Sequence, residues 1–213
     1  MSWGAVIVAS GSSRRMGFDK LSATWQGKPI LWHSVAAFAT LEEISQVVVV
    51  TTPERFGWLT DLGPKLTRVD GGRERPDSVA AGLSALADNI THVAIHDGAR
   101  PLVSREAILK TFTSARETGA ASLARRVTET LKRATPDGIV VESVPRDNLW
   151  LMETPQIFER SLIEQAYHQV GSGDAGITDE VSALQLLGHG TTLVENDHPN
   201  PKITVQADLQ SLP

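Results

Sequence analysis

The chain has 213 residues, of which 41% are hydrophobic and 21% are charged, as in a globular protein that buries a substantial core. Twenty basic residues against 25 acidic residues give a formal net charge of −5, which argues against a broad nucleic-acid-binding surface. The chain contains no cysteine, which excludes disulfides, thiolate zinc sites and a cysteine nucleophile.

The N-terminal residues and the hydropathy of the chain predict a cytoplasmic protein. Residues 1–4 lack the basic region and the long apolar region of a signal peptide. No stretch approaches the roughly 20 consecutive apolar residues that cross a bilayer. We therefore expect neither a membrane partner nor a nucleic-acid partner.

Short apolar runs alternate with longer amphipathic runs in the first half of the chain. Residues 47–50 are consecutive valines, a run too short for a helix and typical of a strand covered on both faces. Ser104 is a suitable N-cap for a helix that ends near Thr118. The alternation predicts a mostly parallel sheet with helices on both faces, in which ligands bind at the carboxyl ends of the strands. We expect strands at 3–9, 47–50, 66–70 and 93–96, and helices at 30–41, 55–62, 77–87 and 104–118.

The pattern changes between about residues 128 and 150. Residues 128–133 alternate between polar and apolar side chains, Pro136-Asp137-Gly138 is a turn signal, and residues 139–144 alternate again. This pattern predicts a β-hairpin arm that projects from the α/β body. Because such an arm has little core of its own, we expect it to pack on a second subunit. Two more helices, at 159–169 and 178–187, complete a single domain of residues 1–213.

The first predicted strand is followed by a loop of small residues that suits a phosphate chain. Ala9, Ser10 and Gly11 let backbone N–H groups approach an anion closely, and Arg15 and Lys20 add two cations. The loop lacks both the Gly-Lys-Ser/Thr ending of a Walker loop and the G-x-G-x-x-G spacing of a dinucleotide-binding loop. On its own, the loop is explained equally well by phosphate binding and by an ordinary turn with solvated basic residues.

A second polar cluster follows the strand predicted at 66–70. The pair Gly71-Gly72 permits positive φ and close approach of the backbone to a ligand. The hydroxyl of Ser78 lies in the first turn of the next predicted helix, where backbone N–H groups favour anions. Taken alone, however, a Gly-Gly pair is more commonly an ordinary strand-to-helix turn.

A third cluster begins with Asp97, which directly follows a predicted strand. A carboxylate at a strand end suits Mg²⁺, which takes one or two carboxylates and completes its shell with water and phosphate oxygens. We favour a metal ligand over a turn or capping residue because Gly98 and Ala99 leave room beside Asp97. His96 is better explained as a packed histidine. Arg100 either grips a phosphate or pairs with a surface acid.

Polar residues in the second half of the chain are ambiguous when taken singly. Thr178 is a good helix N-cap, with acidic residues in the first turn. Thr130 and Lys132 lie on the predicted arm, and Arg146 lies at its return. Lys132, Arg146 and Lys202 could each be an ordinary surface cation.

Taken together, the order and spacing of these motifs resemble the 2-C-methyl-D-erythritol 4-phosphate cytidylyltransferase family of the non-mevalonate isoprenoid pathway. The similarity runs from Ala5 to about Leu209. No single motif is specific, but a chance match of all of them in order is implausible. The shared motifs are the 11–20 loop, Asp70-Gly71-Gly72 with Arg75 and Asp77-Ser78-Val79, His96-Asp97 with Ala99-Arg100-Pro101, Thr130-Leu131-Lys132-Arg133, Arg146 with Leu149-Trp150, Thr154-Pro155-Gln156, Ile177-Thr178-Asp179-Glu180, and Lys202.

The resemblance implies a Rossmann-like α/β fold whose arm interlocks two subunits of a homodimer. It implies transfer of CMP from CTP to 2-C-methyl-D-erythritol 4-phosphate, with release of pyrophosphate and with Mg²⁺ held by Asp97. The residues expected to be catalytic are Arg15, Lys20, Arg146 and Lys202, with Arg146 acting in the partner's site. The expected nucleotide contacts are Ala9, Ser10, Gly11, Ser13, Gly72, Arg73, Ser78 and Gly98, and the expected polyol-phosphate contacts are Arg100, Thr130, Lys132, Arg146, Thr178 and Lys202.

The chain departs from the family pattern at several positions. Ser13 stands where glycine is common, and Arg73 stands where an acidic residue can occur. Gly98 replaces alanine, and Asn200-Pro201-Lys202 replaces the more usual Asn-Ile-Lys. These changes bear on nucleotide affinity and on the support of Lys202, while the charged groups are all present.

The charged residues also fit the chemistry of the implied reaction. A phosphate monoester is largely dianionic at neutral pH and is already a nucleophile, so no general base is required. The catalytic task is to bring two anions together and to stabilise the charge on the α-phosphate and the leaving pyrophosphate. A sequence with several cations and no Ser–His or Cys–His arrangement suits that task.

Three alternatives differ in acceptor or in class. A cytidylyltransferase for another polyol phosphate, such as ribitol 5-phosphate, would use most of the same cations. An NAD-binding dehydrogenase would need the dinucleotide fingerprint that the first loop lacks. A catalytically inactive nucleotide-binding module would bind CTP but release no pyrophosphate.

Overall fold

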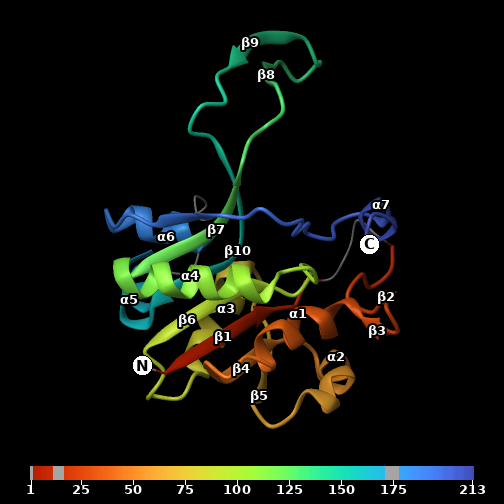
Figure 1. The fold of residues 1–213 in the computed structure, drawn as a ribbon, viewed down its shortest axis with the longest axis vertical. Helices are drawn as coiled ribbons and strands as arrows, with labels where there is room; N and C mark the ends of the chain where they lie inside the picture. The colour runs from red at the N-terminus through yellow and green to blue at the C-terminus, as the bar shows by residue number, and fades with distance from the viewer. Residues whose placement is uncertain (1, 12–16, 171–177) are drawn as a thin grey trace.

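The computed structural model describes residues 2–11, 17–170 and 178–213. Its main feature is a seven-stranded sheet with the order β11-β7-β10-β6-β1-β4-β5 (Figure 1). Within this sheet β10 is antiparallel to both of its neighbours, while every other neighbouring pair is parallel. The mostly parallel sheet expected from the sequence is therefore confirmed. The strands are β1 (Trp3–Val8), β4 (Ile44–Val50), β5 (Leu66–Val69), β6 (His92–Asp97), β7 (Ala120–Arg126), β10 (Trp150–Glu159) and β11 (Thr192–Glu195).

Helices cover both faces of the sheet, as expected. In β4, Val47 and Val49 face one core while Val48 and Val50 face the other, because side chains alternate along a strand. The first core includes residues of α1 (Ile30–Ala39) and α4 (Arg105–Thr118). The second includes residues of α3 (Arg75–Ser84), α5 (Arg160–Val170) and α6 (Glu180–Leu186).

Two of the predicted helices begin earlier than expected. The helix expected at 55–62 is one α-helical turn, α2 (Pro53–Phe56), followed by the 3₁₀ helix η1 (Gly57–Leu62). The helix expected from Asp77 begins at Arg75, because the Asp77 carboxylate accepts the N–H of Glu74 at 3.1 Å and so caps the preceding turn.

The N-cap of α6 is Asp179, so the prediction of Thr178 at this position is wrong. The Asp179 carboxylate accepts the backbone N–H of Ser182 at 3.0 Å, which satisfies a donor of the first turn. Thr178 is exposed, and its hydroxyl lies 3.0 Å from the hydroxyl of Ser182. An aspartate and a threonine side by side carry the same capping signal, and sequence alone did not separate them.

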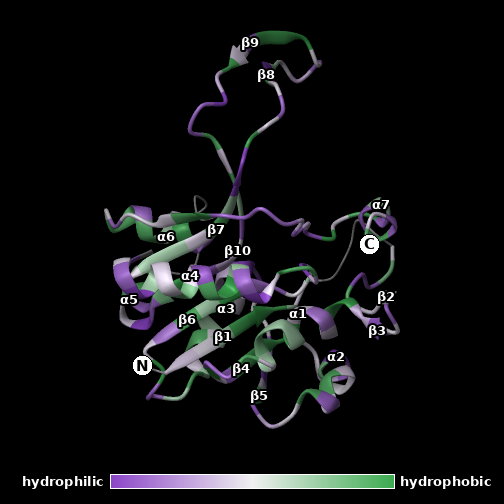
Figure 2. Ribbon diagram, viewed as in Figure 1, coloured by the Kyte–Doolittle hydropathy of each residue, from purple (hydrophilic) through white to green (hydrophobic). Residues whose placement is uncertain are grey.

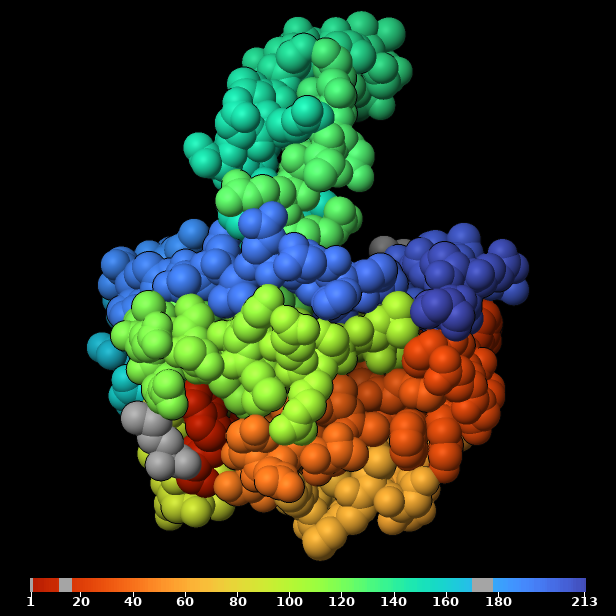
Figure 3. Space-filling view, viewed as in Figure 1, coloured from red at the N-terminus to blue at the C-terminus, as the bar shows by residue number. Residues whose placement is uncertain are grey.

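The predicted arm forms a separate two-stranded antiparallel sheet, β8 (Leu131–Ala134) and β9 (Val140–Val144). It stands away from the body in the ribbon and space-filling views (Figures 1 and 3). Gly138 has φ +82°, which suits glycine in the turn. Ile139, Val140 and Val141 are 67%, 60% and 63% exposed, and the start of β9 has the green of hydrophobic residues in Figure 2. The arm thus presents apolar side chains that its own chain does not cover.

The remaining elements lie around this framework. The sequence pattern did not predict three strands that extend the sheet beyond β6, namely β7, β10 and β11. No helix in the described ranges is long and apolar enough to cross a membrane. The smaller elements are β2 (Thr24–Trp25), β3 (Lys28–Pro29) and α7 (Gln206–Gln210).

Candidate active site

A cavity of about 610 Å³ lies at the carboxyl ends of β1, β5 and β6. Ligands of open α/β sheets bind at this edge, because the polar loops that follow parallel strands meet there. Residues after all three strands contribute to the wall, together with the C-terminal residues Lys202 and Thr204. The predicted site residues that line it are Ala9, Ser10, Gly11, Lys20, Gly72, Arg73, Ser78, Asp97 and Lys202.

The ends of the first loop are held by Arg55, a residue that the sequence did not single out. Arg55 is only 8% exposed, and its guanidinium donates to the Asp19 carboxylate and to the carbonyl oxygens of Ala9 and Gly11. One planar fork thus fastens both ends of the loop. Ser13 and Arg15 lie outside the described residues, and their roles stay predictions.

Lys20 lines the cavity and is fixed by the C-terminal part of the chain. Its Nζ donates to the carbonyl oxygen of Ile203 at 2.7 Å. This contact joins residues separated by 183 positions. It holds the Lys20 cation beside the segment that carries Lys202.

Ser78 connects the first two loops of the cavity. Its hydroxyl lies 3.0 Å from the hydroxyl of Ser10 and accepts the N–H of Gly72 at 3.1 Å. A Cβ on Gly72 would lie 2.1 Å from Cβ of Asp77, so the turn accepts only glycine without rearrangement. The Gly-Gly turn therefore has a packing role whatever it binds.

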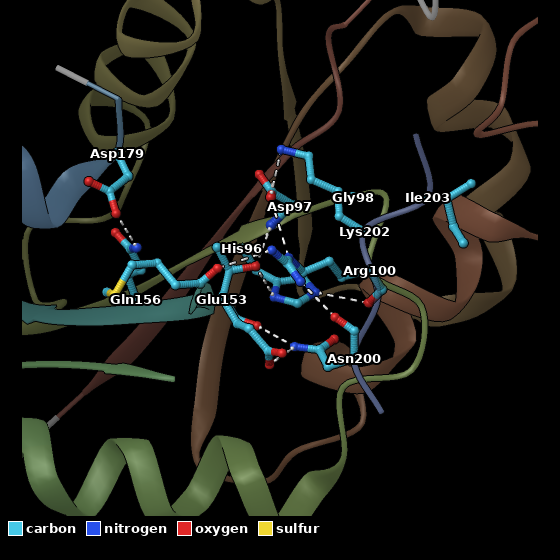
Figure 4. A network of polar contacts seen from close by, with 12 residues as sticks. His96, Asp97, Gly98, Arg100, Glu153, Gln156, Asp179, Asn200, Lys202 and Ile203 are labelled. Carbon is cyan, nitrogen blue, oxygen red and sulfur yellow. Dashed lines mark hydrogen bonds and ion pairs between the residues drawn. The ribbon is translucent and has the colours of Figure 1, made fainter. Parts of the chain in front are cut away.

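Asp97 is a buried carboxylate surrounded by three cations. Its oxygens lie 2.9 Å from Nζ of Lys202, 3.5 Å from Arg75 and 3.6 Å from Arg100. Figure 4 shows Lys202 reaching toward Asp97. Burial would raise the pKa of Asp97, but Lys202, Arg75 and Arg100 outweigh it and hold that pKa well below its usual range. Asp97 is thus fully ionised at neutral pH.

Arg75, the first residue of α3, is positioned by Glu180, the first residue of α6, on the same face of the sheet. The two side chains form a bidentate pair at 2.6 and 3.0 Å, and Glu180 is fully buried. Burial alone would lower the pKa of Arg75, but the carboxylates of Glu180 and Asp97 raise it above the ordinary value. Tyr167 donates its hydroxyl to Glu180 at 3.0 Å. The sequence placed Arg75 and Glu180 in motifs but gave no sign that they meet.

His96 is packed beneath the cavity, as the sequence indicated. It is fully buried, and its Nε2 donates to the carbonyl oxygen of Arg100 at 3.1 Å, while Nδ1 lies 2.9 Å from the hydroxyl of Thr154. Burial lowers the pKa of His96 to about 4, so the ring is neutral at pH 7. It does not line the cavity.

Arg100 and Gly98 have structural partners that the sequence did not predict. Arg100 donates to the carbonyl oxygen of Asn200 at 2.6 Å and does not line the main cavity. Gly98 donates its N–H to Val8 and accepts from Ser34, and a Cβ on it would lie 3.0 Å from Cβ of Ala9. The absence of a side chain therefore permits packing against β1, and nucleotide contact by Gly98 stays a prediction.

Besides Arg100, four predicted substrate residues lie away from the cavity wall of their own chain. Thr130, Lys132 and Arg146 are exposed on the arm, and Thr178 is exposed at the start of α6. Lys132 donates to the hydroxyl of Ser143, and Arg146 donates to the carbonyl oxygen of Thr128. The arm residues can reach a site only by way of another chain or a movement of the arm.

These features define a class: an α/β protein with a nucleotide-sized pocket at the strand ends, in which cations converge on one acid. The sequence profile of the 2-C-methyl-D-erythritol 4-phosphate cytidylyltransferase family matches residues 4–212. The chain belongs to this family, and its Rossmann-like fold is confirmed by solved structures of the family.

Individual relatives resemble the chain over nearly its whole length. The cytidylyltransferase of this name from Caldanaerobacter subterraneus is 37% identical over 223 residues, which covers 98% of this chain and 96% of the relative. That from Chromobacterium violaceum is 39% identical over 214 residues, covering 96% and 93%. The crystal structure of the Francisella tularensis enzyme has a TM-score of 0.85 and 30% identity, covering 99% and 97%.

Proposed function

We propose that this protein transfers CMP from CTP to 2-C-methyl-D-erythritol 4-phosphate and releases pyrophosphate. The observation that carries the proposal is the contact of Asp97 with Lys202 at 2.9 Å on the wall of a cavity that Lys20 also lines. Family membership supplies the substrate pair, since the relatives are named for this reaction. The cytoplasmic location expected from the sequence stays a prediction.

The cations of the cavity account for the chemistry of the transfer. The acceptor phosphate is itself the nucleophile, so the residues need only hold two anions together and stabilise the added charge. Lys20, fixed by Ile203, binds the phosphates of CTP and the departing pyrophosphate. Lys202 aims the acceptor phosphate at the α-phosphorus. A fixed donor of this kind requires no reorganisation during the reaction.

Asp97 is the residue that would hold Mg²⁺. It is ionised, it faces the cavity, and no group of three acids or histidines among the described residues could hold a metal without the substrate. That donor set fits Mg²⁺, which usually keeps water and substrate phosphate oxygens in most of its coordination positions. When bound, Mg²⁺ supplies positive charge to the triphosphate. Lys202 and Arg75 keep the carboxylate charged.

The arm supports the further proposal of a homodimer. Ile139, Val140 and Val141 are exposed apolar side chains, and Thr130, Lys132 and Arg146 are remote from their own cavity. A partner that covers the arm would bury the apolar side chains and receive Arg146 near its acceptor phosphate. Light scattering should give twice the chain mass of 23.0 kDa, and Val140→Glu should reduce it. A wild-type mass of one chain would contradict the dimer.

The reaction is tested by measuring pyrophosphate release from CTP, UTP and ATP, each with 2-C-methyl-D-erythritol 4-phosphate and with ribitol 5-phosphate, with and without Mg²⁺. We expect release to be fastest with CTP, the methylerythritol phosphate and Mg²⁺. Faster release with ribitol 5-phosphate would reassign the acceptor. Binding of CTP with no release for either acceptor would contradict the proposal.

A further inference from the structure

The segment that carries Lys202 has no regular secondary structure. Residues 196–204, called here the 196–204 segment, connect β11 to the residues before α7 as irregular chain. Pro199 and Pro201 have no backbone N–H, so this segment has fewer backbone donors than usual with which to anchor itself. Something else must fix it if Lys202 is to meet Asp97.

Asn200 is the main anchor of the 196–204 segment. It is 4% exposed, and its Nδ2 donates to the Glu153 carboxylate and to the carbonyl oxygen of Thr154, both at 3.0 Å. Its own carbonyl oxygen accepts from Arg100 at 2.6 Å. Three residues further on, the N–H of Ile203 donates to the carbonyl oxygen of Ala99 at 2.8 Å. Lys202 thus lies between two fixed points.

The buried carboxylate of Glu153 accepts hydrogen bonds from two asparagines of the 196–204 segment. It lies in β10 and is 4% exposed, and the same oxygen accepts Nδ2 of Asn200 at 3.0 Å and Nδ2 of Asn196 at 2.8 Å. Arg125 approaches the other oxygen at 3.7 Å from the solvent side. Figure 4 shows Glu153 directed at Asn200, below the contact of Lys202 with Asp97. A buried carboxylate is retained at low cost only when donors of this kind surround it.

We propose that Glu153 is a positioning residue for the transfer. It does not line the main cavity, and it acts by holding Asn196 and Asn200 so that the 196–204 segment presents Lys202 to Asp97 and the acceptor phosphate. This inference rests on the proposed function for its kinetic consequence. Its structural consequence, an ordered segment that depends on Glu153, stands apart from activity.

The kinetic test compares Glu153→Ala with Glu153→Gln. The alanine variant loses the carboxylate oxygen that accepts both amides, so we expect kcat/KM for the polyol phosphate to fall about tenfold or more, with a smaller change in KM for CTP. Glutamine keeps one acceptor oxygen at nearly the same place and should recover most of the loss. Glu195→Ala is the matched control, because Glu195 directly precedes the segment and, among the residues that the structure describes, forms its ion pair with the exposed Arg126 at 3.2 Å.

A double-mutant cycle with Lys202 separates positioning from a general loss of stability. If Glu153 acts through Lys202, Glu153→Ala should change the acceptor kcat/KM by less than about twofold in a Lys202→Ala background. Equal losses in both backgrounds, or a Glu153→Ala variant as active as the wild type, would overturn the proposal. Should Glu153→Ala fail to fold, Asn196→Ala removes one of the two amides and is used in the same cycle.

Hydrogen exchange tests the inference without any activity. In Glu153→Ala, peptides covering the 196–204 segment should exchange about tenfold faster or more, while those of β1 and β6 stay protected. The Glu195→Ala control should leave the segment as in the wild type. Unchanged exchange in Glu153→Ala overturns the positioning role even if the reaction itself is confirmed. Faster exchange in Glu153→Ala, together with a wild-type protein that releases no pyrophosphate from CTP, would instead refute only the proposed function.

Discussion

The cavity and the arm both carry charged residues, but they differ in how far those side chains are held by contacts within the chain. At the cavity, charged side chains are fixed by partners within the same chain, such as the buried Asp97 by Lys202 and the buried Arg55 by Asp19. On the arm, Arg146 and Lys132 are exposed, and apolar residues such as Val140 face outward. The described residues of the nucleotide half of the proposed site are therefore preformed within one chain, whereas the arm is the half that the proposed partner subunit would cover.

The sharpest test of the preformed half is Lys20→Ala. A fixed cation at developing charge contributes roughly 3–4 kcal/mol to catalysis, so kcat should fall about a hundredfold to a thousandfold while CTP binding is partly kept. Lys28→Ala is the control, because Lys28 is a lysine nearby in the sequence that is partly exposed, does not line the cavity and pairs with Asp61 at 2.6 Å. Steady-state kinetics and CTP titration provide the two measurements. Near-normal turnover in Lys20→Ala would remove Lys20 from the mechanism.

Low pH should lower the free energy of unfolding of the α/β body, because His96 is buried in its neutral form. Burial holds the pKa of His96 at about 4 in the folded state, against an ordinary value of 6.5, so the unfolded chain binds its proton first as the pH falls. Stability from the neutral ring is present above pH 6.5 and is lost progressively toward pH 4, with a loss of about 2 kcal/mol at pH 5 relative to pH 7.5. Urea unfolding at the two pH values measures this. His96→Gln should show a shallower dependence, and an equal slope in both proteins would disprove the assignment.

The arm half is tested by Arg146→Ala, which should raise KM for the polyol phosphate about tenfold and leave KM for CTP nearly unchanged. Arg133→Ala is the matched control, since Arg133 is an exposed arginine on the same arm that pairs with Glu142 at 2.6 Å. An unaltered KM in Arg146→Ala would show that this cation does not meet the acceptor.

Mixing Lys20→Ala and Arg146→Ala chains decides whether the arm acts in the partner's site. If it does, each mixed dimer has one site with both native residues, so random reassembly should restore about a quarter of wild-type activity. If Arg146 serves its own chain, mixing restores nothing beyond the average of the two variants. Rescue in proportion to the fraction of mixed dimers would establish the division between body and arm.

The sequence predicted the strand-end clusters well because apolar strands and small-residue loops are local patterns. β7 went unassigned because Ala120–Arg126 is rich in alanine and ends in two arginines. β10 went unassigned because Pro155 interrupts its run. Arg55 and Glu153 were missed for a different reason: each is a charged residue whose burial depends on partners 36 and 47 positions away. The residues next to Arg55 and Glu153 in the sequence form no local pattern that indicates such a contact.

The bond between Lys20 and Ile203 has a consequence for how the protein is made. A ribosome emits the chain from its N-terminal end, and most of the sheet can assemble while residues near 200 are still being synthesised. The pocket then closes late, through a contact that spans 183 positions. Nascent chains arrested before Lys202 should acquire the sheet but bind CTP weakly, which ribosome-stalled intermediates can reveal.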